Sequence, residues 1–125
     1  MITTAKTPND AWPTEIKSLA DGKALQVSFD TGDVFEFPAE LLRVESPSAE
    51  VQGHSPEEKK TIPGKRNVKI KKIEPAGNYA VLLRFDDGHD TGLFSWEYLY
   101  DLGKRHDDIW QAYLDELEAQ NMSRD

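Results

Sequence analysis

The chain of 125 residues contains no cysteine. It therefore cannot form a disulfide, bind a metal through thiolates or use a cysteine as a nucleophile. The absence does not indicate a redox compartment, because a chain without cysteine is stable in either setting.

Long apolar runs are missing as well. No stretch approaches the ~20 consecutive apolar residues that a membrane-spanning helix needs. Residues 1–8 lack the apolar core of a signal peptide. We therefore expect a cytoplasmic protein that does not enter a membrane, and the length suits a single domain with its own core.

Positive charge is in deficit, since the formal net charge is −8 at pH 7. Such a charge opposes general binding to phosphate backbones. Seven of the 15 basic residues nevertheless lie between residues 59 and 72, with no aromatic residue among them. We interpret this strip as a solvated loop and strand face, and we expect no binding to nucleic acid.

Motifs of enzyme chemistry are also lacking. The sequence has no G-x-S-x-G segment and no glycine-rich loop of the Walker or dinucleotide-binding type. The pairs Asp86-Asp87 and Asp107-Asp108 are adjacent in sequence, which is typical of a turn and a helix start rather than of an opposed acid and base. We therefore expect a protein that is not an enzyme.

Apolar residues at a period of two predict two groups of strands. The first group covers residues 14–37 as a three-stranded meander, with Asp21-Gly22 as a hairpin turn. The second group covers strands at 67–74, 79–85 and 90–94. Each group is expected to be antiparallel, because tight turns join its strands.

Helices are predicted after each group. Residues 39–43 should form one helical turn, with Pro38 as its first residue. A short helix should run over 96–102, begun by Ser95 as N-cap and ended by Gly103 in a left-handed conformation. An amphipathic helix should cover about 107–120. The fold class is therefore α+β, with antiparallel hairpins and meanders packed together beside a short helix and a C-terminal amphipathic helix.

These elements suggest a simple domain organisation. Residues 1–13 are expected to form a flexible arm, residues 14–120 a single domain, and residues 121–125 a frayed C-terminus. Residues 44–66 are rich in proline, glycine and serine and should form a long loop. Loops of this length are usually functional or disordered, and the sequence leaves both alternatives open.

The two strand groups share a pattern. Phe29-Asp30-Thr31-Gly32 aligns with Phe85-Asp86-Asp87-Gly88, and each is followed by a short strand and a helical turn. A single hairpin is not stable in water, so we predict that the two hairpins pack on each other.

Two groups of side chains are candidates for a binding site. The histidines could hold a metal together with nearby carboxylates, although none of them has the spacing of a known site. His89 lies in a turn beside three aspartates, which should favour its charged form. Aromatic residues are dense between 94 and 113, and Tyr98, Tyr100 and Tyr113 are candidates for a surface that binds a protein partner, with core packing as the alternative.

Several segments together carry a family resemblance. They resemble the gamma-butyrobetaine hydroxylase-like N-terminal domain family, in particular its small stand-alone bacterial branch of unknown function. The resemblance covers most of residues 14–103. The segments that carry it are Leu41-Leu42-Arg43, residues 46–54, residues 85–92 and Trp96-Glu97-Tyr98-Leu99.

The resemblance implies a metal site that this chain does not keep intact. In the hydroxylases the related domain holds zinc through three cysteines and one histidine. Carried across, the cysteine positions fall on Ser46, Ser48 and Val51, and the histidine falls on His89. Serine and valine are poor zinc ligands. The hydroxylases also have an oxygenase domain, for which 125 residues leave no room, so no hydroxylase activity is expected.

A similar module is fused to iron–sulfur carrier ATPases of the P-loop type. We expect a small monomeric binding or adaptor module that is not an enzyme, needs no cofactor and contacts a protein partner, such as an iron–sulfur carrier ATPase. The alternative is a metal-linked accessory protein that binds zinc or iron through His89 and His54 and assists iron–sulfur cluster assembly or delivery.

Overall fold

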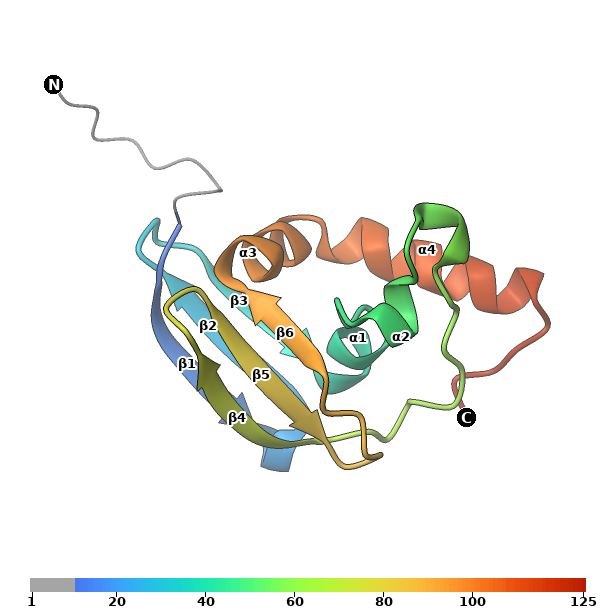
Figure 1. The fold of residues 1–125 in the computed structure, drawn as a ribbon, viewed down its shortest axis with the longest axis horizontal. Coiled ribbons are helices and arrows are strands. Elements are labelled where there is room, and N and C mark those ends of the chain that lie inside the picture. The colour runs from blue at the N-terminus through green and yellow to red at the C-terminus, as the bar shows by residue number, and fades with distance from the viewer. Residues whose placement is uncertain (1–10) are drawn as a thin grey trace, which may run out of the picture.

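Two antiparallel three-stranded sheets form the framework of the structure, a computed structural model that describes residues 11–125 (Figure 1). The first sheet has the order β1-β2-β3 and the second the order β4-β5-β6, so both predicted meanders are confirmed. The strands are β1 (Pro13–Leu19), β2 (Ala24–Phe29), β3 (Val34–Pro38), β4 (Ile70–Ala76), β5 (Ala80–Phe85) and β6 (Gly92–Ser95).

Within residues 11–125, four α-helices accompany the sheets: α1 (Ala39–Val44), α2 (Ala49–Gln52), α3 (Trp96–Lys104) and α4 (His106–Ala119). Figure 1 shows α3 and α4 along one side of the sheets, with α1 and α2 beside them. None of the helices within residues 11–125 is long and apolar enough to cross a membrane. The predicted α+β class with a C-terminal helix is confirmed.

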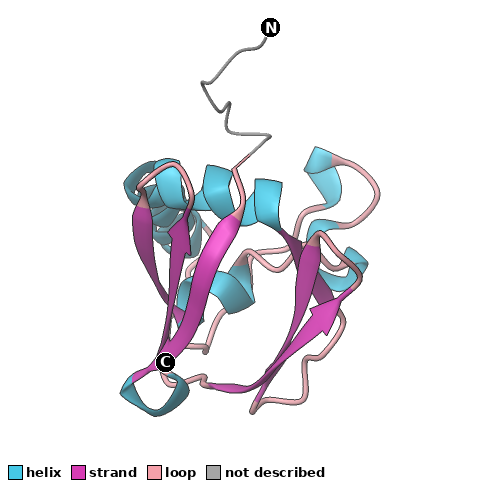
Figure 2. Ribbon diagram, turned by 90° about the vertical axis from the view of Figure 1, so that its left-hand side faces the viewer, coloured by secondary structure: helices cyan, strands magenta, loops and turns pink. Residues whose placement is uncertain are grey.

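The core lies between the two sheets, which face each other in Figure 2. Alternate residues of β2 and of β5 are buried, as the period of two requires for strands with one covered face. One apolar cluster therefore joins side chains of both sheets, including Leu25, Val27, Leu83 and Phe94, which are 0% exposed.

The two hairpins that share a sequence pattern also share a turn geometry. Phe29 N–H donates to Asp33 O at 2.8 Å, and Phe85 N–H donates to His89 O at 2.9 Å. Gly32 and Gly88 both have a φ of 91°, a conformation that strongly favours glycine. Each hairpin leads directly into a helix, so the repeat in the sequence is a repeat in the structure.

Residues 44–66 differ from the long loop expected from the sequence. They contain α2 and a short 3₁₀ helix (Pro56–Glu58). Residues 53–64, here called the strap, are also fastened to the rest of the domain. Lys60 N–H donates to Val51 O at 2.7 Å, and the Tyr113 hydroxyl donates to Ile62 O at 2.6 Å. The strap is therefore a bound segment beside α4.

The C-terminus is likewise not the frayed end that the sequence suggested. Gly64 N–H donates to Ser123 O, and Arg66 N–H donates to Arg124 O, both at 3.0 Å. These bonds pair the tail with the end of the strap, as the path of the chain in Figure 1 shows.

Three predicted boundaries also differ from those in the structure. Residues 1–10 of the expected arm lie outside the described residues, but Ala11 is 3% exposed and Trp12 N–H donates to Asp30 Oδ1 at 3.1 Å. The domain therefore starts before residue 14. Gly103, expected to end a helix, lies inside α3 without a positive φ. Pro38 closes β3 and precedes α1 in an extended conformation.

Candidate functional site

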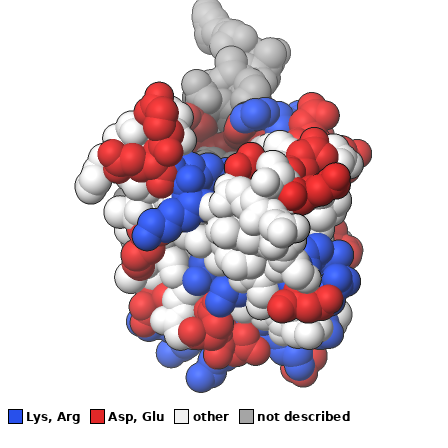
Figure 3. Space-filling view, turned by 90° about the vertical axis from the view of Figure 1, so that its right-hand side faces the viewer, with Lys and Arg blue, Asp and Glu red and all other residues white. Residues whose placement is uncertain are grey.

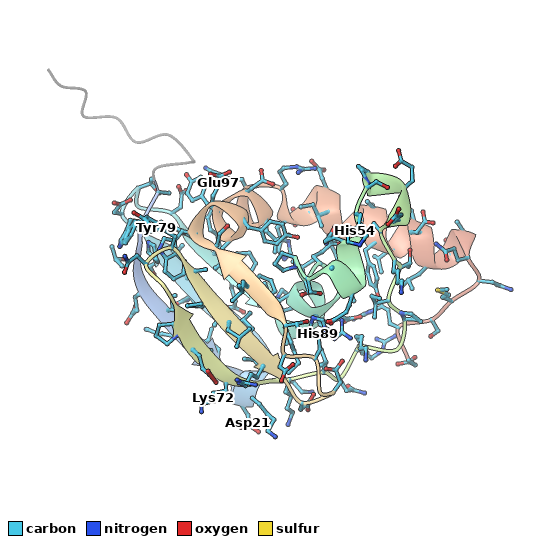
Figure 4. The ribbon with its side chains drawn as sticks, in the orientation of Figure 1. Asp21, His54, Lys72, Tyr79, His89 and Glu97 are labelled. Carbon is cyan, nitrogen blue, oxygen red and sulfur yellow. The ribbon has the colours of Figure 1, made fainter. Side chains whose placement is uncertain are left out.

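His89 lies at the centre of a small buried polar cluster. Its side chain is next to the connection between α1 and α2 (Figure 4). The Nε2 atom is 2.9 Å from Ser46 Oγ and 3.3 Å from Ser48 Oγ. His89 is 9% exposed, Ser48 6% and Ser46 0%. The resemblance assigns the four zinc-ligand positions of the family to four residues of this chain, and the structure brings three of them together.

Local structure fixes the two serines. The Ser46 hydroxyl donates to Ser48 Oγ at 3.2 Å and accepts the Ser48 N–H at 3.4 Å. Gly92 of β6 leaves room for this hydroxyl, since a Cβ on Gly92 would lie 2.4 Å from Ser46 Oγ. Val51, the fourth position, is 1% exposed in α2. The serines therefore fill a closed site and satisfy one another by hydrogen bonding.

Charges around His89 act in opposite directions. Burial lowers the pKa of His89, and the nearby Arg43 guanidinium lowers it further, while the carboxylates of Glu50, Asp87 and Asp90 act the other way. The net direction is down, so the ring is neutral at pH 7. The aspartates do favour the charged ring, as expected, but burial and the Arg43 charge outweigh them.

The Asp87 carboxylate is in contact with the cations that surround this turn. Burial alone would raise its pKa, but Asp87 accepts hydrogen bonds from Lys65 Nζ at 2.6 Å, Arg43 Nε at 2.7 Å and the His89 N–H at 3.0 Å. Together these bonds lower the pKa of Asp87 to about 2. The carboxylate is ionised and fully engaged at neutral pH, and it holds the His89 turn in place.

The donor atoms of this cluster do not fit the family's zinc. A neutral imidazole is a suitable ligand, but serine hydroxyls are neutral and weak donors, and valine offers none. Within residues 11–125, no three or more His, Asp, Glu or Cys side chains are grouped to hold a metal ion. His54 lies exposed in the strap, apart from His89 in Figure 4. The structure does not bring these two histidines together.

The tyrosines proposed for partner binding do not form an exposed surface. Tyr100 and Tyr113 are each 5% exposed, and Tyr98 is half-buried. Each hydroxyl has an internal acceptor: Asp33 Oδ2 for Tyr100, Ile62 O for Tyr113 and Glu45 O for Tyr98. A tyrosine can be buried at little cost when its hydroxyl is satisfied in this way. The prediction of an aromatic surface at these residues was wrong, and core packing holds instead.

Other aromatic residues are exposed. Tyr79 is 67% exposed, Trp12 is 44% exposed, and Trp96 is half-buried. The Trp12 ring packs edge-on against Tyr79 and Trp96, with centroid distances of 5.6 and 6.3 Å. We call these three residues the aromatic patch. Sequence analysis missed the patch, although Tyr79 follows the Gly77-Asn78 turn, where a side chain projects from the tip of a hairpin.

A groove of about 580 Å³ separates the strap from α3 and α4. Apolar side chains line it together with charged groups of both signs, and we call it the helix–strap groove. Among the apolar residues are Val44, Leu102, Ile109, Ala112 and Tyr113. The groove and the aromatic patch share no residue.

The basic strip of residues 59–72 is mostly paired with carboxylates. Five of its seven cations form ion pairs in the structure. The pairs are Lys59–Glu45, Lys65–Asp87, Arg66–Asp125, Lys69–Asp21 and Lys72–Glu74. The face drawn in Figure 3 likewise mixes basic and acidic side chains around an uncharged centre. Within residues 11–125 the cations of the strip are therefore interspersed with carboxylates.

Comparisons with known proteins agree with the fold. One protein solved by NMR in solution is 47% identical over 92% of this chain and 90% of its own, with a TM-score of 0.79. A crystal structure from Acidithiobacillus ferrooxidans, of a DUF971-family protein of unknown function, is 37% identical over 73% of this chain and 91% of its own, with a TM-score of 0.61. No curated protein matches. The family model "Gamma-butyrobetaine hydroxylase-like, N-terminal" matches residues 16–100, and the chain therefore belongs to that family.

Proposed function

We propose that this domain is a binding or adaptor module without enzyme activity, and that a protein partner docks on the aromatic patch. The observation that carries the proposal is the exposure of two large aromatic side chains in contact, Tyr79 at 67% and Trp12 at 44%. Phenylalanine and tyrosine side chains elsewhere among residues 11–125 are buried or half-buried.

The patch has the properties of an interface centre. Tyrosine and tryptophan dominate the binding energy of many interfaces, since they offer a large contact area with few rotatable bonds. The backbone beneath the patch is fixed: Trp96 N–H donates to Tyr79 O at 2.9 Å, and Trp96 Nε1–H donates to Asn78 O at 3.0 Å. A partner would therefore meet side chains that are already held in place, which lowers the entropic cost of binding.

A catalytic role for the buried cluster has little support. Ser46 Oγ and His89 Nε2 are at the distance of a nucleophile and its base, 2.9 Å. However, Ser46 is 0% exposed and lies against Gly92, so a substrate could not reach its hydroxyl. The cluster is better explained as a satisfied structural element.

The metal-linked alternative, zinc or iron at His89 and His54 in the service of an iron–sulfur carrier ATPase, also has weak support. One neutral histidine with two serine hydroxyls is a poor donor set for either metal. The partner proposed for the aromatic patch is a protein such as this ATPase, and this part of the proposal depends on the patch and not on a metal.

Site-specific photo-crosslinking tests the proposal. A benzophenone amino acid would replace Tyr79 in one variant and Val34 in another, since Val34 of β3 is 58% exposed and is not a residue of the aromatic patch. We expect irradiation of cells to give a defined protein adduct from position 79 only, and Trp12→Ala to abolish it. Equal adducts from both positions, or an adduct indifferent to Trp12→Ala, would contradict docking on the patch.

A further inference from the structure

The helix–strap groove has the size of a binding site and walls that are already in place. Its volume of about 580 Å³ lies within the usual ~300–1,000 Å³ of ligand sites. The strap wall is tied down on both sides of the groove. Lys59 Nζ is 2.7 Å from Glu45 Oε1, and the Gln120 amide donates to Thr61 Oγ1 at 3.0 Å.

Negative charge dominates the groove on the side of α4. This helix carries five carboxylates and no lysine or arginine. Two of the five, Asp108 and Glu116, line the groove, and Glu57 of the strap faces it as well.

Two of the three cations that line the groove are paired with carboxylates that line it as well. Lys59 is paired with Glu45, and Arg105 Nη1 is 3.2 Å from Asp101 Oδ2. Lys60 alone among the lining cations forms no ion pair within residues 11–125. The lining therefore keeps a surplus of carboxylates, and the net charge of −8 adds a long-range attraction for cations.

From this shape and charge, we infer that the helix–strap groove binds a basic peptide segment of a protein partner, one that carries an apolar side chain between lysines or arginines. The apolar side chain would lie against Ile109 and Ala112, which are half-buried and exposed, respectively. The basic side chains would place their aliphatic stems on the same surface and their charged ends near Asp108 and Glu116. Since the groove and the aromatic patch share no residue, this second surface is independent of the proposed function.

Nuclear magnetic resonance titration of the full chain tests the inference. The probe is a short capped peptide of leucine, alanine and arginine, and its counterpart has glutamate in place of each arginine. We expect the arginine peptide to shift amide signals of the groove, such as those of Leu102, Thr61 and Ala112, and to bind more weakly as salt is added. The glutamate peptide should not bind.

Two double variants of α4 provide the matched comparison. Asp108→Asn with Glu116→Gln removes two carboxylates that line the groove, whereas Asp115→Asn with Glu118→Gln removes two that do not. Both variants change the net charge by the same amount. We expect the first variant to bind the arginine peptide about fivefold more weakly than the parent chain, and the second to bind it with an affinity within about twofold of the parent. Charges close to the peptide act strongly, whereas more distant charges are screened by salt.

Three results would overturn the inference. If both double variants lowered the affinity for the arginine peptide equally, the acidic helix would attract cations without a specific site. The absence of groove shifts at millimolar peptide would mean that the groove binds no such segment. Shifts confined to Tyr79 and Trp12 would place the peptide on the aromatic patch, and the proposed function would then stand while the groove inference fell.

Discussion

The side chain of Arg124, the next-to-last residue, binds the carboxylate of Glu40, a residue of α1 that lies 84 positions earlier in the sequence. Arg124 Nη2 is 2.6 Å from Glu40 Oε1, and Nε is 2.8 Å from Oε2, so the pair is bidentate. Glu40 is 5% exposed. The Arg124 guanidinium also lies 5.2 Å from the centre of the Trp110 ring. The tail thus neutralises a buried charge of the core.

Arg124→Ala should therefore destabilise the domain strongly. The change leaves the buried Glu40 carboxylate without its cation, and we expect a loss of about 2–3 kcal/mol in the free energy of unfolding. Arg66→Ala is the control, because the Arg66–Asp125 pair is 44% and 69% exposed and should contribute less than ~1 kcal/mol. Urea denaturation of both variants would measure the difference. Similar losses for the two arginines would show that the tail is held by its backbone bonds rather than by Glu40.

Asp87 should make stability depend on acid pH. Its folded pKa of about 2 lies below the ordinary 3.8, so its contribution is fully present above about pH 4 and is lost as the pH falls through about 2. Asp87→Asn should cost about 1–2 kcal/mol at pH 7, with the difference from the parent shrinking towards pH 2. Denaturation at several pH values would test this, and a constant difference across the range would refute it.

His89 should titrate below the usual 6.5. Between that value and its folded pKa the unfolded chain binds more protons, so stability should fall as the pH drops below about 6.5. Because the Arg43 charge lowers the pKa of His89, Arg43→Gln should raise it, as followed by the His89 ring signals. Lys65→Gln is the control, since Lys65 also binds Asp87 but is not among the main causes of the shift in the pKa of His89. A lower or unchanged pKa in Arg43→Gln would contradict the assigned cause.

The buried cluster should become a metal site when its donors are changed. The triple substitution of Ser46, Ser48 and Val51 to cysteine places three thiolates around the His89 imidazole, the donor set that structural zinc sites use. We expect one zinc per chain and a higher melting temperature for the triple variant, and no zinc for the parent. The same triple variant with His89→Ala should bind zinc much more weakly. Equal zinc content with and without His89 would mean that the four positions do not form one site.

Much of the fold could be predicted from short-range patterns. Period-two apolar residues located the strands, and Gly32 and Gly88 marked turns that only glycine adopts readily. Ser95 was predicted as an N-cap, and its Oγ accepts the Tyr98 N–H at 3.0 Å. These signals are local, because each depends on residues a few positions apart.

The parts that could not be predicted depend on distant partners. The Tyr113 hydroxyl donates a hydrogen bond to Ile62 O in the strap, which allows the side chain to be buried. No feature of the sequence near Tyr113 indicates that acceptor. The tail is ordered by Glu40 and by the end of the strap. For the site, Ser46, Ser48 and His89 are positions that the resemblance links, and they lie together in the structure. The aromatic patch unites Trp12, Tyr79 and Trp96 from three separate segments of the chain.

Gly103 illustrates the same limit and yields a further prediction. In a helix, Gly103→Ala would ordinarily stabilise by about 1 kcal/mol. Here a Cβ would lie 2.4 Å from both Cγ and Cδ2 of the Phe35 ring, which is itself packed against Phe29 and Tyr100. The ring has little freedom to retreat, so we expect Gly103→Ala to destabilise by about 1–3 kcal/mol.

A second substitution separates this clash from any effect on the helix itself. Phe35→Leu removes ring atoms that the new methyl group would meet, so the combination with Gly103→Ala should be more stable than the sum of the single effects implies. Such a coupling between contacting residues is expected to reach about 1 kcal/mol, measurable by urea denaturation of the four chains. Simple additivity, or a stable Gly103→Ala variant, would mean that α3 can shift away from β3, and that Gly103 is not required for the close approach of the two elements.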